Sequence, residues 1–333
     1  MNEFENPIGS GVDLDLVPVA CAMCGIAETK PHPVFEGYDY EYRTCDNRFR
    51  FVACADCGHV YLSPRCKVQD LDRIYPDSLA RSSATAYRVS GLARWLKRSV
   101  FDSTWMKKVL ANLQDGSSIL DIGAGSGSQL LFLAERSPKN TSFYANELKF
   151  DDHARESLLA RGIEVLEGPI EGIDIKVRFD AIICIQVVEH VVNPREVMGW
   201  ISAHLAPGGI LFLETPDLNA PARFLFKSHW GALAFPRHFH LFSRKALADL
   251  AIDNGLEIDS HYGVSAAAAW TLSLRNRLGM SAATEHRGML RIFGYKNVFM
   301  LTIFTLIDWI LMLCGCSTSN QVLIARKPQS DVP

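Results

Sequence analysis

From residue 117 onward, short apolar runs alternate with amphipathic segments, and glycine, proline or capping residues separate them. The run Phe179–Ile185 is almost continuously apolar, which is typical of a central parallel strand buried on both faces. Asn193-Pro194 predicts the start of a helix, because a capping residue stands before a proline. The predicted strands are 118–122, 141–147, 163–166, 179–185, 210–214, 257–264 and 320–327, and the predicted helices cover about 127–136, 151–161, 193–205 and 243–254. The alternation predicts an α/β fold with a Rossmann-like, doubly wound and mostly parallel sheet.

Other parts of the chain follow different patterns. After Ser63 a polar stretch continues to about Ala84 and is interpreted as a linker. Residues 87–113 carry apolar side chains at helical spacing, which predicts one or two amphipathic helices that end at Gly116. Residues 265–319 form an insert between the last two predicted strands.

The composition is that of an ordinary globular protein, since 48% of the 333 residues are hydrophobic and 21% are charged. The net charge of −3 gives no basic excess, so a nucleic-acid partner is not expected. Residues Met1–Glu5 have neither basic charge nor an apolar run, so we predict no signal peptide and a cytoplasmic location. Clustered cysteines in that compartment hold metal more often than they form disulfides.

Six of the nine cysteines fall before residue 67, and four of them form two CxxC pairs. A glycine, Gly25 or Gly58, follows each pair and suits a tight metal-binding turn. Four thiolates complete a closed tetrahedral site, so we expect one structural zinc ion per chain. Scattered free thiols or a redox CxxC are the alternatives, and Cys45, His59 and Cys66 are candidate substitute ligands. The expected zinc ligands are Cys21, Cys24, Cys54 and Cys57.

A glycine-rich loop, Asp121-x-Gly123-x-Gly125-x-Gly127, follows the first strand of the α/β region. Glycines there let the backbone come close to a ligand and adopt unusual φ angles. Glu147, at the end of the next strand, is placed to bind ribose hydroxyls, as in dinucleotide-binding folds. The third glycine comes one residue earlier than in the dinucleotide fingerprint, however. The pattern therefore favours a nucleoside with a cationic tail over a dinucleotide, and a plain tight turn is the alternative.

Four segments in this order resemble class I S-adenosylmethionine-dependent methyltransferases of the small-molecule branch. They are the glycine-rich loop, Glu147, the run from Phe179-Asp180-Ala181-Ile182 to Glu189-His190, and Leu205-x-Pro207-Gly208-Gly209. The resemblance covers about residues 117–327 and implies S-adenosylmethionine as cofactor and a seven-stranded sheet whose last strand is antiparallel. The CxxC pairs resemble those of bacterial methyltransferases that carry a small zinc-binding segment, some of which act on nucleotide sugars.

The resemblance also assigns cofactor-binding roles residue by residue. The loop would hold the methionine end, Glu147 would bind the ribose, and Leu148 would lie beside the adenine, while Gln186 and Val187 would line the methyl-donor end. Where the family often has an acidic residue after a glycine in the third strand, Pro169 follows Gly168, so the adenine contact is lost or passes to the backbone at Ile170. The expected cofactor-binding residues are Asp121, Gly123, Gly125, Gly127, Glu147, Leu148, Gln186 and Val187.

Methyl transfer needs an in-line nucleophile and a base that takes its proton, and histidine suits that role at neutral pH. The candidate bases are His190, beside the methyl-donor end, and His238 and His240, in a segment where such folds place substrate. Arg237 is a candidate for binding a substrate phosphate or carboxylate. A structural cap or core hydrogen bond is the alternative for each histidine.

The insert contains the nearly unbroken apolar run Val298–Leu313, whose length approaches that of a membrane span. Asp308 would be costly in a bilayer, and the following strand must return to the sheet, so we do not expect a span. A buried helix or a homodimer interface is one interpretation. A surface-bound helix in peripheral contact with a membrane is the other.

These patterns predict a methyltransferase that acts on a small molecule, and the expected acceptor is a sugar nucleotide or a polysaccharide or secondary-metabolite precursor. A membrane-associated lipid or quinone methyltransferase, an NAD-dependent oxidoreductase and a non-catalytic binding module are the alternatives. The expected domains are a zinc-binding segment at 1–75, a linker with amphipathic helices at 76–116 and a methyltransferase domain at 117–333.

Overall fold

The computed structural model describes residues 12–27, 32–75, 103–279 and 297–329. The chain divides into two compact units. Unit 1 comprises residues 1–79, 216–246 and 263–321, and unit 2 comprises residues 80–215, 247–262 and 322–333. Unit 1 thus contains the candidate zinc-binding segment together with two later stretches of the expected methyltransferase domain.

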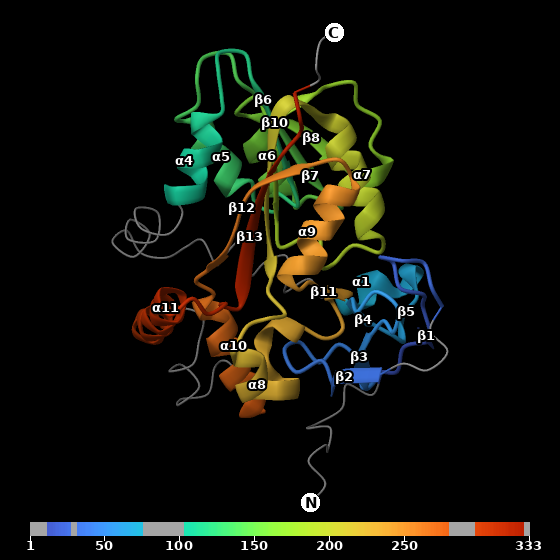
Figure 1. Cartoon of the computed structure of the whole chain (residues 1–333). Coiled ribbons are helices and arrows are strands. Elements are labelled where there is room, and N and C mark those ends of the chain that lie inside the picture. Colours follow the sequence, from blue (N-terminus) through green and yellow to red (C-terminus); the bar gives the residue numbers. More distant parts are fainter. Residues whose placement is uncertain (1–11, 28–31, 76–102, 280–296, 330–333) are drawn as a thin grey trace, which may run out of the picture. The chain divides into compact units, whose positions relative to one another are not determined.

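A seven-stranded sheet has the strand order β12-β13-β10-β9-β6-β7-β8 (Figure 1). The neighbours from β10 to β8 pair in parallel. β13 runs against β10, because Gly208 and Gly209 near the start of β10 form backbone hydrogen bonds with Lys327, just past the end of β13. The expected Rossmann-like sheet with an antiparallel last strand is therefore confirmed. Its strands are β6 (Ser118–Ile122), β7 (Ser142–Glu147), β8 (Glu164–Glu167), β9 (Phe179–Ile185), β10 (Leu205–Pro216), β12 (Glu257–Val264) and β13 (Asn320–Arg326).

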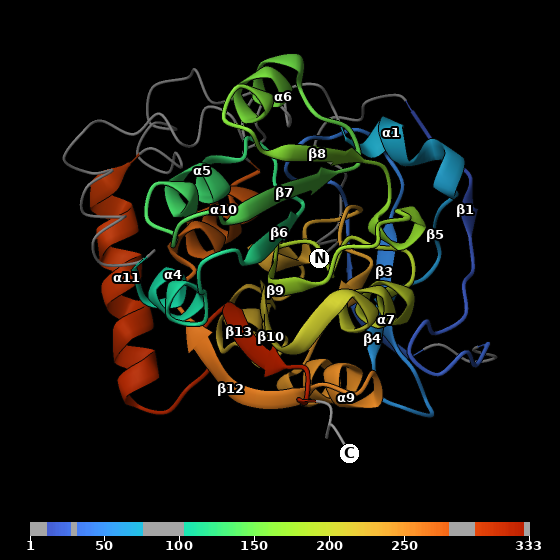
Figure 2. The same ribbon diagram turned by 90° about the horizontal axis from the view of Figure 1, so that it is seen from above.

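Helices cover this sheet on both sides, with α4 and α5 on one side and α7 on the other (Figure 2). Trp105 of α4 stacks on Phe212 of β10, with ring centroids 4.8 Å apart. The side chains of Asp151 and Asn193 cap α6 and α7, as the sequence predicts for α7. Residues 87–102 of the expected amphipathic helices lie outside the described residues. The helices are α4 (Ser103–Ala111), α5 (Ser128–Ala134), α6 (Asp152–Leu159), the 3-10 turn η3 (Ile170–Gly172), α7 (Pro194–His204) and α9 (Arg244–Asp253).

Unit 1 contains a four-stranded antiparallel sheet of order β11-β4-β3-β2. The large side chains of Phe49, Phe51, Tyr61 and Leu62 are fully buried around it. A separate antiparallel pair joins β1 to β5. The strands are β1 (Leu16–Val17), β2 (His32–Gly37), β3 (Phe49–Ala53), β4 (Val60–Leu62), β5 (Arg65–Cys66) and β11 (His240–Leu241).

The prediction of a linker after Ser63 is wrong for the residues up to Ile74. This stretch forms β5, the 3-10 turn η1 (Val68–Asp70) and the short helix α1 (Leu71–Ile74). Cys66 and Ile74 are buried and hold it against unit 1. Cys66 and Ile74 are eight positions apart and give no helical or strand periodicity, so the polar residues between them led to the prediction of a linker. The remainder of the expected linker lies outside the described residues.

The later part of unit 1 is helical. The apolar run forms α11 with the predicted bounds, and Asp308 on α11 is buried against α10. The carboxylate of Asp308 accepts hydrogen bonds from Ala266 N, Trp270 Nε1 and Ser265 Oγ, at 2.7, 2.8 and 3.0 Å. Within the described ranges, no helix has the length and hydropathy needed to cross a membrane. The elements are α8 (Ala222–Phe226), the 3-10 turns η4 (Lys227–His229) and η5 (Gly231–Leu233), α10 (Ala267–Arg277) and α11 (Val298–Leu313).

Candidate functional site

The glycine-rich loop leads from β6 into α5, and its three glycines take positive φ angles of 71°, 54° and 68°. A Cβ at Gly123 would lie 2.3 Å from Cγ2 of Val187, and a Cβ at Gly127 would lie 2.3 Å from Cδ2 of Leu158. The corresponding position at Gly125 has no atom within 4 Å. Close packing therefore requires glycine at the two outer positions, while the middle one leaves the backbone open to a ligand.

Glu147, at the end of β7, is tied to this loop. Its Oε2 accepts a hydrogen bond of 3.1 Å from the N–H of Gly125, and its Oε1 accepts one of 3.0 Å from the N–H of Leu148. Burial raises the pKa of Glu147, and these two N–H donors offset part of that rise. Leu148 beside it is 67% exposed. The structure thus brings Glu147, which is expected to bind the ribose, together with the loop that is expected to hold the methionine, within unit 2.

Asp121 lies beneath the loop on β6 and is only 3% exposed. Ala145 and Ile183 are its partners on the neighbouring strands. Burial, with a smaller contribution from the charge of Glu147, raises the pKa of Asp121 to about 8. A cationic ligand beside this carboxyl would favour its ionised form, so the site fits a ligand that carries an ammonium group.

Gln186 follows β9 with a left-handed φ of 55°, and its backbone N–H donates to the carbonyl of Glu214 over 2.8 Å. Its side-chain Nε2 is buried and has no hydrogen-bond partner among the described residues. A buried amide donor without a protein partner is available to a bound water molecule or to a ligand atom. Val187, the next residue, packs on Gly123, so the expected methyl-donor end adjoins the loop.

A family model described as a methyltransferase domain matches residues 92–261. The chain belongs to this methyltransferase-domain family. The matched range contains all eight residues expected to bind the cofactor and the three candidate histidines. The glycine loop, the acidic end of β7 and the sheet order are those of a class I member of the family.

Relatives and solved structures point the same way. The ubiquinone biosynthesis O-methyltransferase of Schizosaccharomyces pombe is 30% identical over 118 residues, covering 34% of this chain and 43% of that protein. (S)-coclaurine N-methyltransferase of Papaver somniferum is 28% identical over 108 residues, covering 31% of each chain. The chain thus spans less than half the length of these curated relatives. Phosphoethanolamine N-methyltransferase 2 of Haemonchus contortus, solved with S-adenosyl-L-methionine, shares the fold at a TM-score of 0.51 and 15% identity, over 81% of this chain and 63% of that one.

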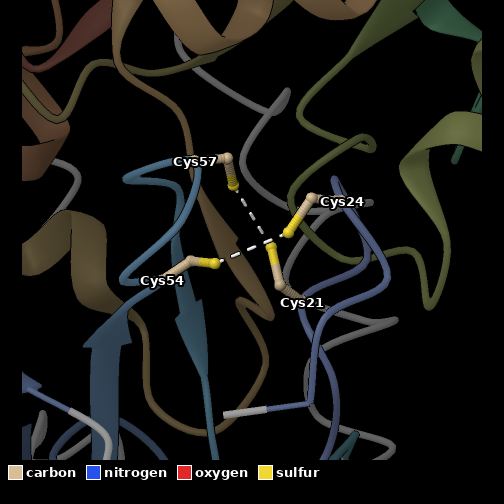
Figure 3. A group of neighbouring side chains, drawn as sticks. All are labelled: Cys21, Cys24, Cys54 and Cys57. Carbon is tan, nitrogen blue, oxygen red and sulfur yellow. Dashed lines mark hydrogen bonds between the residues drawn. The ribbon is translucent and has the colours of Figure 1, made fainter.

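The four expected zinc ligands come together in unit 1, where their sulfurs all lie within 4.8 Å of one another (Figure 3). Cys21 Sγ lies 3.6 Å from Cys57 Sγ, and Cys24 Sγ lies 3.5 Å from Cys54 Sγ. Gly25 and Gly58 both adopt the positive φ that the two turns require. The candidate substitutes Cys45, His59 and Cys66 are not members of this cluster. The spacing of the sulfurs suits four ligands around one ion.

The three candidate histidines have different surroundings. His190, in unit 2, has a 28% exposed side chain, and its Nε2 lies 4.0 Å from Oε1 of the buried Glu189. Burial raises the pKa of Glu189 to about 8, although the hydrogen bond that its carboxylate accepts from Thr215 lowers the pKa in part. In unit 1, His238 Nδ1 lies 2.8 Å from the carbonyl of Ala232, and His240 Nδ1 lies 3.1 Å from His59 Nε2.

Arg237, the candidate for binding a substrate anion, is already paired with acidic side chains of the protein itself. It is buried, and its NH1 and NH2 donate to the two carboxylate oxygens of Asp39 at 3.2 and 3.0 Å. Glu41 adds a second acidic group at 3.6 Å. The sequence analysis missed Asp39 and the link between His59 and His240, because nothing in the local pattern joins residues so far apart along the chain.

Proposed function

We propose that the protein is an S-adenosylmethionine-dependent methyltransferase that acts on a small organic acceptor. When bound, S-adenosylmethionine supplies a methyl group already activated on a sulfonium centre. The observation that carries the proposal is the meeting of Asp121, the glycine loop and Glu147 at the carboxyl ends of β6 and β7. Together they offer a buried carboxyl for an ammonium group, open backbone at Gly125 and a carboxylate for ribose hydroxyls.

The remaining cofactor roles follow from position. Leu148 is exposed beside Glu147 and would cover one face of the adenine. Gln186 would direct its buried amide toward the methyl-donor end, and Val187 would close that end against the loop. The sequence Gly168-Pro169 places no acidic side chain at the usual adenine position, so adenine binding would rest on backbone groups near Ile170.

His238 is the candidate base that the hydrogen bonding favours. The carbonyl of Ala232 only accepts hydrogen bonds, so the proton of a neutral His238 ring sits on Nδ1. The lone pair is then on Nε2, which is the nitrogen that would take a proton from an acceptor hydroxyl or amine. His190 and His240 remain candidates whose contribution the same experiments would measure.

Two classes of acceptor are considered, and two observations favour the apolar one. The internal ion pair with Asp39 already engages the guanidinium of Arg237, which weakens the case for a phosphate ligand there and so for a sugar nucleotide. Ubiquinone biosynthesis O-methyltransferases are among the relatives. We therefore propose a quinone-type or other apolar phenolic acceptor first, and a sugar nucleotide or polysaccharide precursor second.

The surface of α11 supports an apolar acceptor presented at a membrane. Seven residues along one side of this helix are exposed, and all but Thr302 are apolar. The hydroxyl of Thr302 donates to the carbonyl of Val298, so its hydrogen is already bonded within the helix. Apolar side chains gathered on one exposed side of a helix mark a site of contact with a membrane or with another protein. The exposed residues are Val298, Phe299, Thr302, Leu306, Trp309, Ile310 and Leu313.

We also propose that the four clustered cysteines hold one structural zinc ion. Four thiolates leave no open coordination position, so the metal would organise the amino-terminal segment rather than take part in methyl transfer. Burial raises the pKa of Cys21, and a bound zinc ion would offset that cost by favouring the thiolate.

Native mass spectrometry of the purified chain, before and after addition of S-adenosylhomocysteine, tests the cofactor, the metal and the homodimer together. We expect the spectrum to show one zinc ion and one nucleoside ligand per chain. In a separate activity assay with a panel of acceptors that includes nucleotide sugars, we expect methyl transfer from S-adenosylmethionine to a phenolic acceptor. Bound nicotinamide nucleotide would favour the oxidoreductase alternative. A chain that never binds S-adenosylhomocysteine would favour a non-catalytic binding module.

Co-sedimentation with phospholipid vesicles separates a membrane-facing α11 from a dimer interface. We expect wild-type protein in the pellet, and the variant Phe299→Ser/Ile310→Ser in the supernatant. If both proteins stay in the supernatant and the substitutions convert a wild-type dimer into a monomer, this face is instead the interface with a second copy of the chain. Both substituted residues are exposed, and the buried Phe304 and Asp308 stay in place, so we expect the variant to fold.

A further inference from the structure

A groove within unit 1 lies between β2 and the segment that forms α8 and η4 (Figure 1). Its volume is about 520 Å³, which is within the range of small-molecule sites. None of its lining residues belongs to the proposed cofactor or zinc sites. They are Pro33, Val34, Phe35 and Glu36 from β2, and Arg223, Phe224, Lys227 and Ser228 from the other side.

The groove offers apolar side chains to a ligand. Val34 and Phe224 are 38% and 67% exposed. The half-buried Phe35 is anchored against Trp230, with ring centroids 6.3 Å apart. β2 is the last strand of its sheet, and a proline such as Pro33 on an edge strand discourages pairing with a further strand. A ligand would therefore bind to the side chains and not by adding a strand.

The charge of the groove is mainly positive. Neither Arg223 nor Lys227 forms an ion pair with another described residue, and the buried Nε of Arg223 has no hydrogen-bond partner among them. The guanidinium carbon of Arg223 lies 4.3 Å from the centroid of the Phe224 ring. Glu36, the one acidic residue among the lining residues, accepts a hydrogen bond from Arg48 and is thereby engaged. Two cations without a protein carboxylate therefore line an apolar groove, and the complementary ligand is an anion with an apolar part.

The backbone of Lys227 supports a role for its side chain. Its φ of 47° and ψ of −123° lie in a region that glycine adopts readily and other residues rarely. The conformation is held on both sides, because the N–H of Lys227 donates to the carbonyl of Arg223 and its own carbonyl accepts from the N–H of Trp230. Strained positions of this kind gather at ligand-binding sites. A lysine where glycine would be unstrained favours retention of the residue for its charge.

We propose that this groove binds an amphiphilic phosphate, meaning a phosphate monoester that carries an apolar chain or ring. A phosphate monoester has a charge of about −1.5 to −2 at pH 7, which matches the two cations, whereas a carboxylate would leave one of them uncompensated. Val34 and Phe224 would contact the apolar part. A hollow of this volume receives a molecule that enters it, whereas contact with a bilayer is made by protruding side chains. Binding here requires no methyl transfer, so its test is independent of the proposed function.

Isothermal titration calorimetry of the full-length protein with octyl phosphate, kept below its micelle concentration, tests the proposal. We expect one molecule to bind per chain. Octanol and inorganic phosphate should each bind at least about tenfold more weakly, because the first lacks the charge and the second lacks the apolar contacts. Arg223→Gln/Lys227→Gln should lower the affinity for octyl phosphate about tenfold or more. Lys176→Gln, at an exposed position in unit 2, is the matched control and should leave it unchanged.

Lys227→Gly separates the charge from the backbone strain. It removes both, so we expect a higher melting temperature together with a lower affinity for octyl phosphate. Unchanged affinity in this variant would contradict a role for the lysine. Equal affinities of the wild type and the double glutamine variant, or of octyl phosphate and inorganic phosphate, would overturn the proposal. Binding to anionic phospholipid vesicles that depends on Arg223 and Lys227, without binding of octyl phosphate, would also overturn it and assign the groove to a membrane surface.

Discussion

Val187 and Gly123 pack so closely that Cγ2 of Val187 lies 2.3 Å from where a Cβ on Gly123 would be. The first residue belongs to the segment after β9 and the second to the loop after β6, and these strands are neighbours in the sheet. The segment expected at the methyl-donor end and the loop expected to hold the methionine are therefore packed against each other. Any side chain larger than hydrogen at position 123 must displace either Val187 or the loop.

Gly123→Ala is accordingly expected to weaken binding of S-adenosylhomocysteine more than tenfold, measured by isothermal titration calorimetry. Gly162→Ala is the matched control, because Gly162 has nearly the same φ of 72° but no atom within 4 Å of the added Cβ. The control should lose about 1 kcal/mol of stability to backbone strain and keep its affinity. Equal affinities in the two variants would contradict a role for this packing in cofactor binding.

The raised pKa of Asp121 predicts how stability depends on pH. Burial raises the pKa of this carboxyl from 3.8 to about 8 on folding, so the folded state binds more protons between these two pH values. Stability without ligand should then fall as pH rises through that window. Asp121→Asn should make this slope shallower without removing it, because the raised pKa values of Glu147 and Glu189 contribute in the same direction, and the exposed Asp174→Asn should leave it unchanged. Thermal unfolding from about pH 5 to 8 measures both, and identical slopes in all three proteins would rule out the assignment.

Removal of the metal should affect unit 1 selectively. We expect Cys21→Ser to abolish zinc binding, measured by metal analysis, and to lower the melting temperature. Cys316→Ser is the control, because Cys316 is exposed and lies outside the cluster. A chelator should reproduce the effect of Cys21→Ser in the wild type. Full zinc content in Cys21→Ser would show that the cluster does not bind the ion through four thiolates.

Local patterns predicted much of this molecule, and long-range contacts account for what they missed. The strands β6, β7 and β9 and the glycine loop were predictable because apolar runs and glycine spacing act within a few residues. The pairs Asp39–Arg237 and His59–His240 join residues 198 and 181 positions apart, and no local periodicity encodes them. The short elements after Ser63 were hidden for another reason, since only Cys66 and Ile74 of that stretch are buried apolar residues.

We expect Asp308 to stabilise the helical part of unit 1, because its carboxylate accepts three hydrogen bonds there. Asp308→Ala leaves the buried donors of Ala266 and Trp270 without an acceptor, so we expect a loss of about 3 kcal/mol in unfolding free energy. Asp308→Asn keeps one acceptor oxygen and should lose about half as much. Urea denaturation measures the series. A stable alanine variant would show that the carboxylate is retained for a reason other than folding.

The buried ion pair between Arg237 and Asp39 allows a structural arginine to be distinguished from one that binds substrate. Arg237→Ala leaves Asp39 as an uncompensated buried charge, so we expect a loss of about 3–5 kcal/mol. Replacing both partners, as in Arg237→Met/Asp39→Leu, removes both charges and should recover most of that stability. If the arginine is structural, the double variant also keeps the KM of the wild type for its acceptor. A stable double variant with a raised KM only for phosphorylated acceptors would instead return Arg237 to the substrate site and restore the case for a sugar nucleotide.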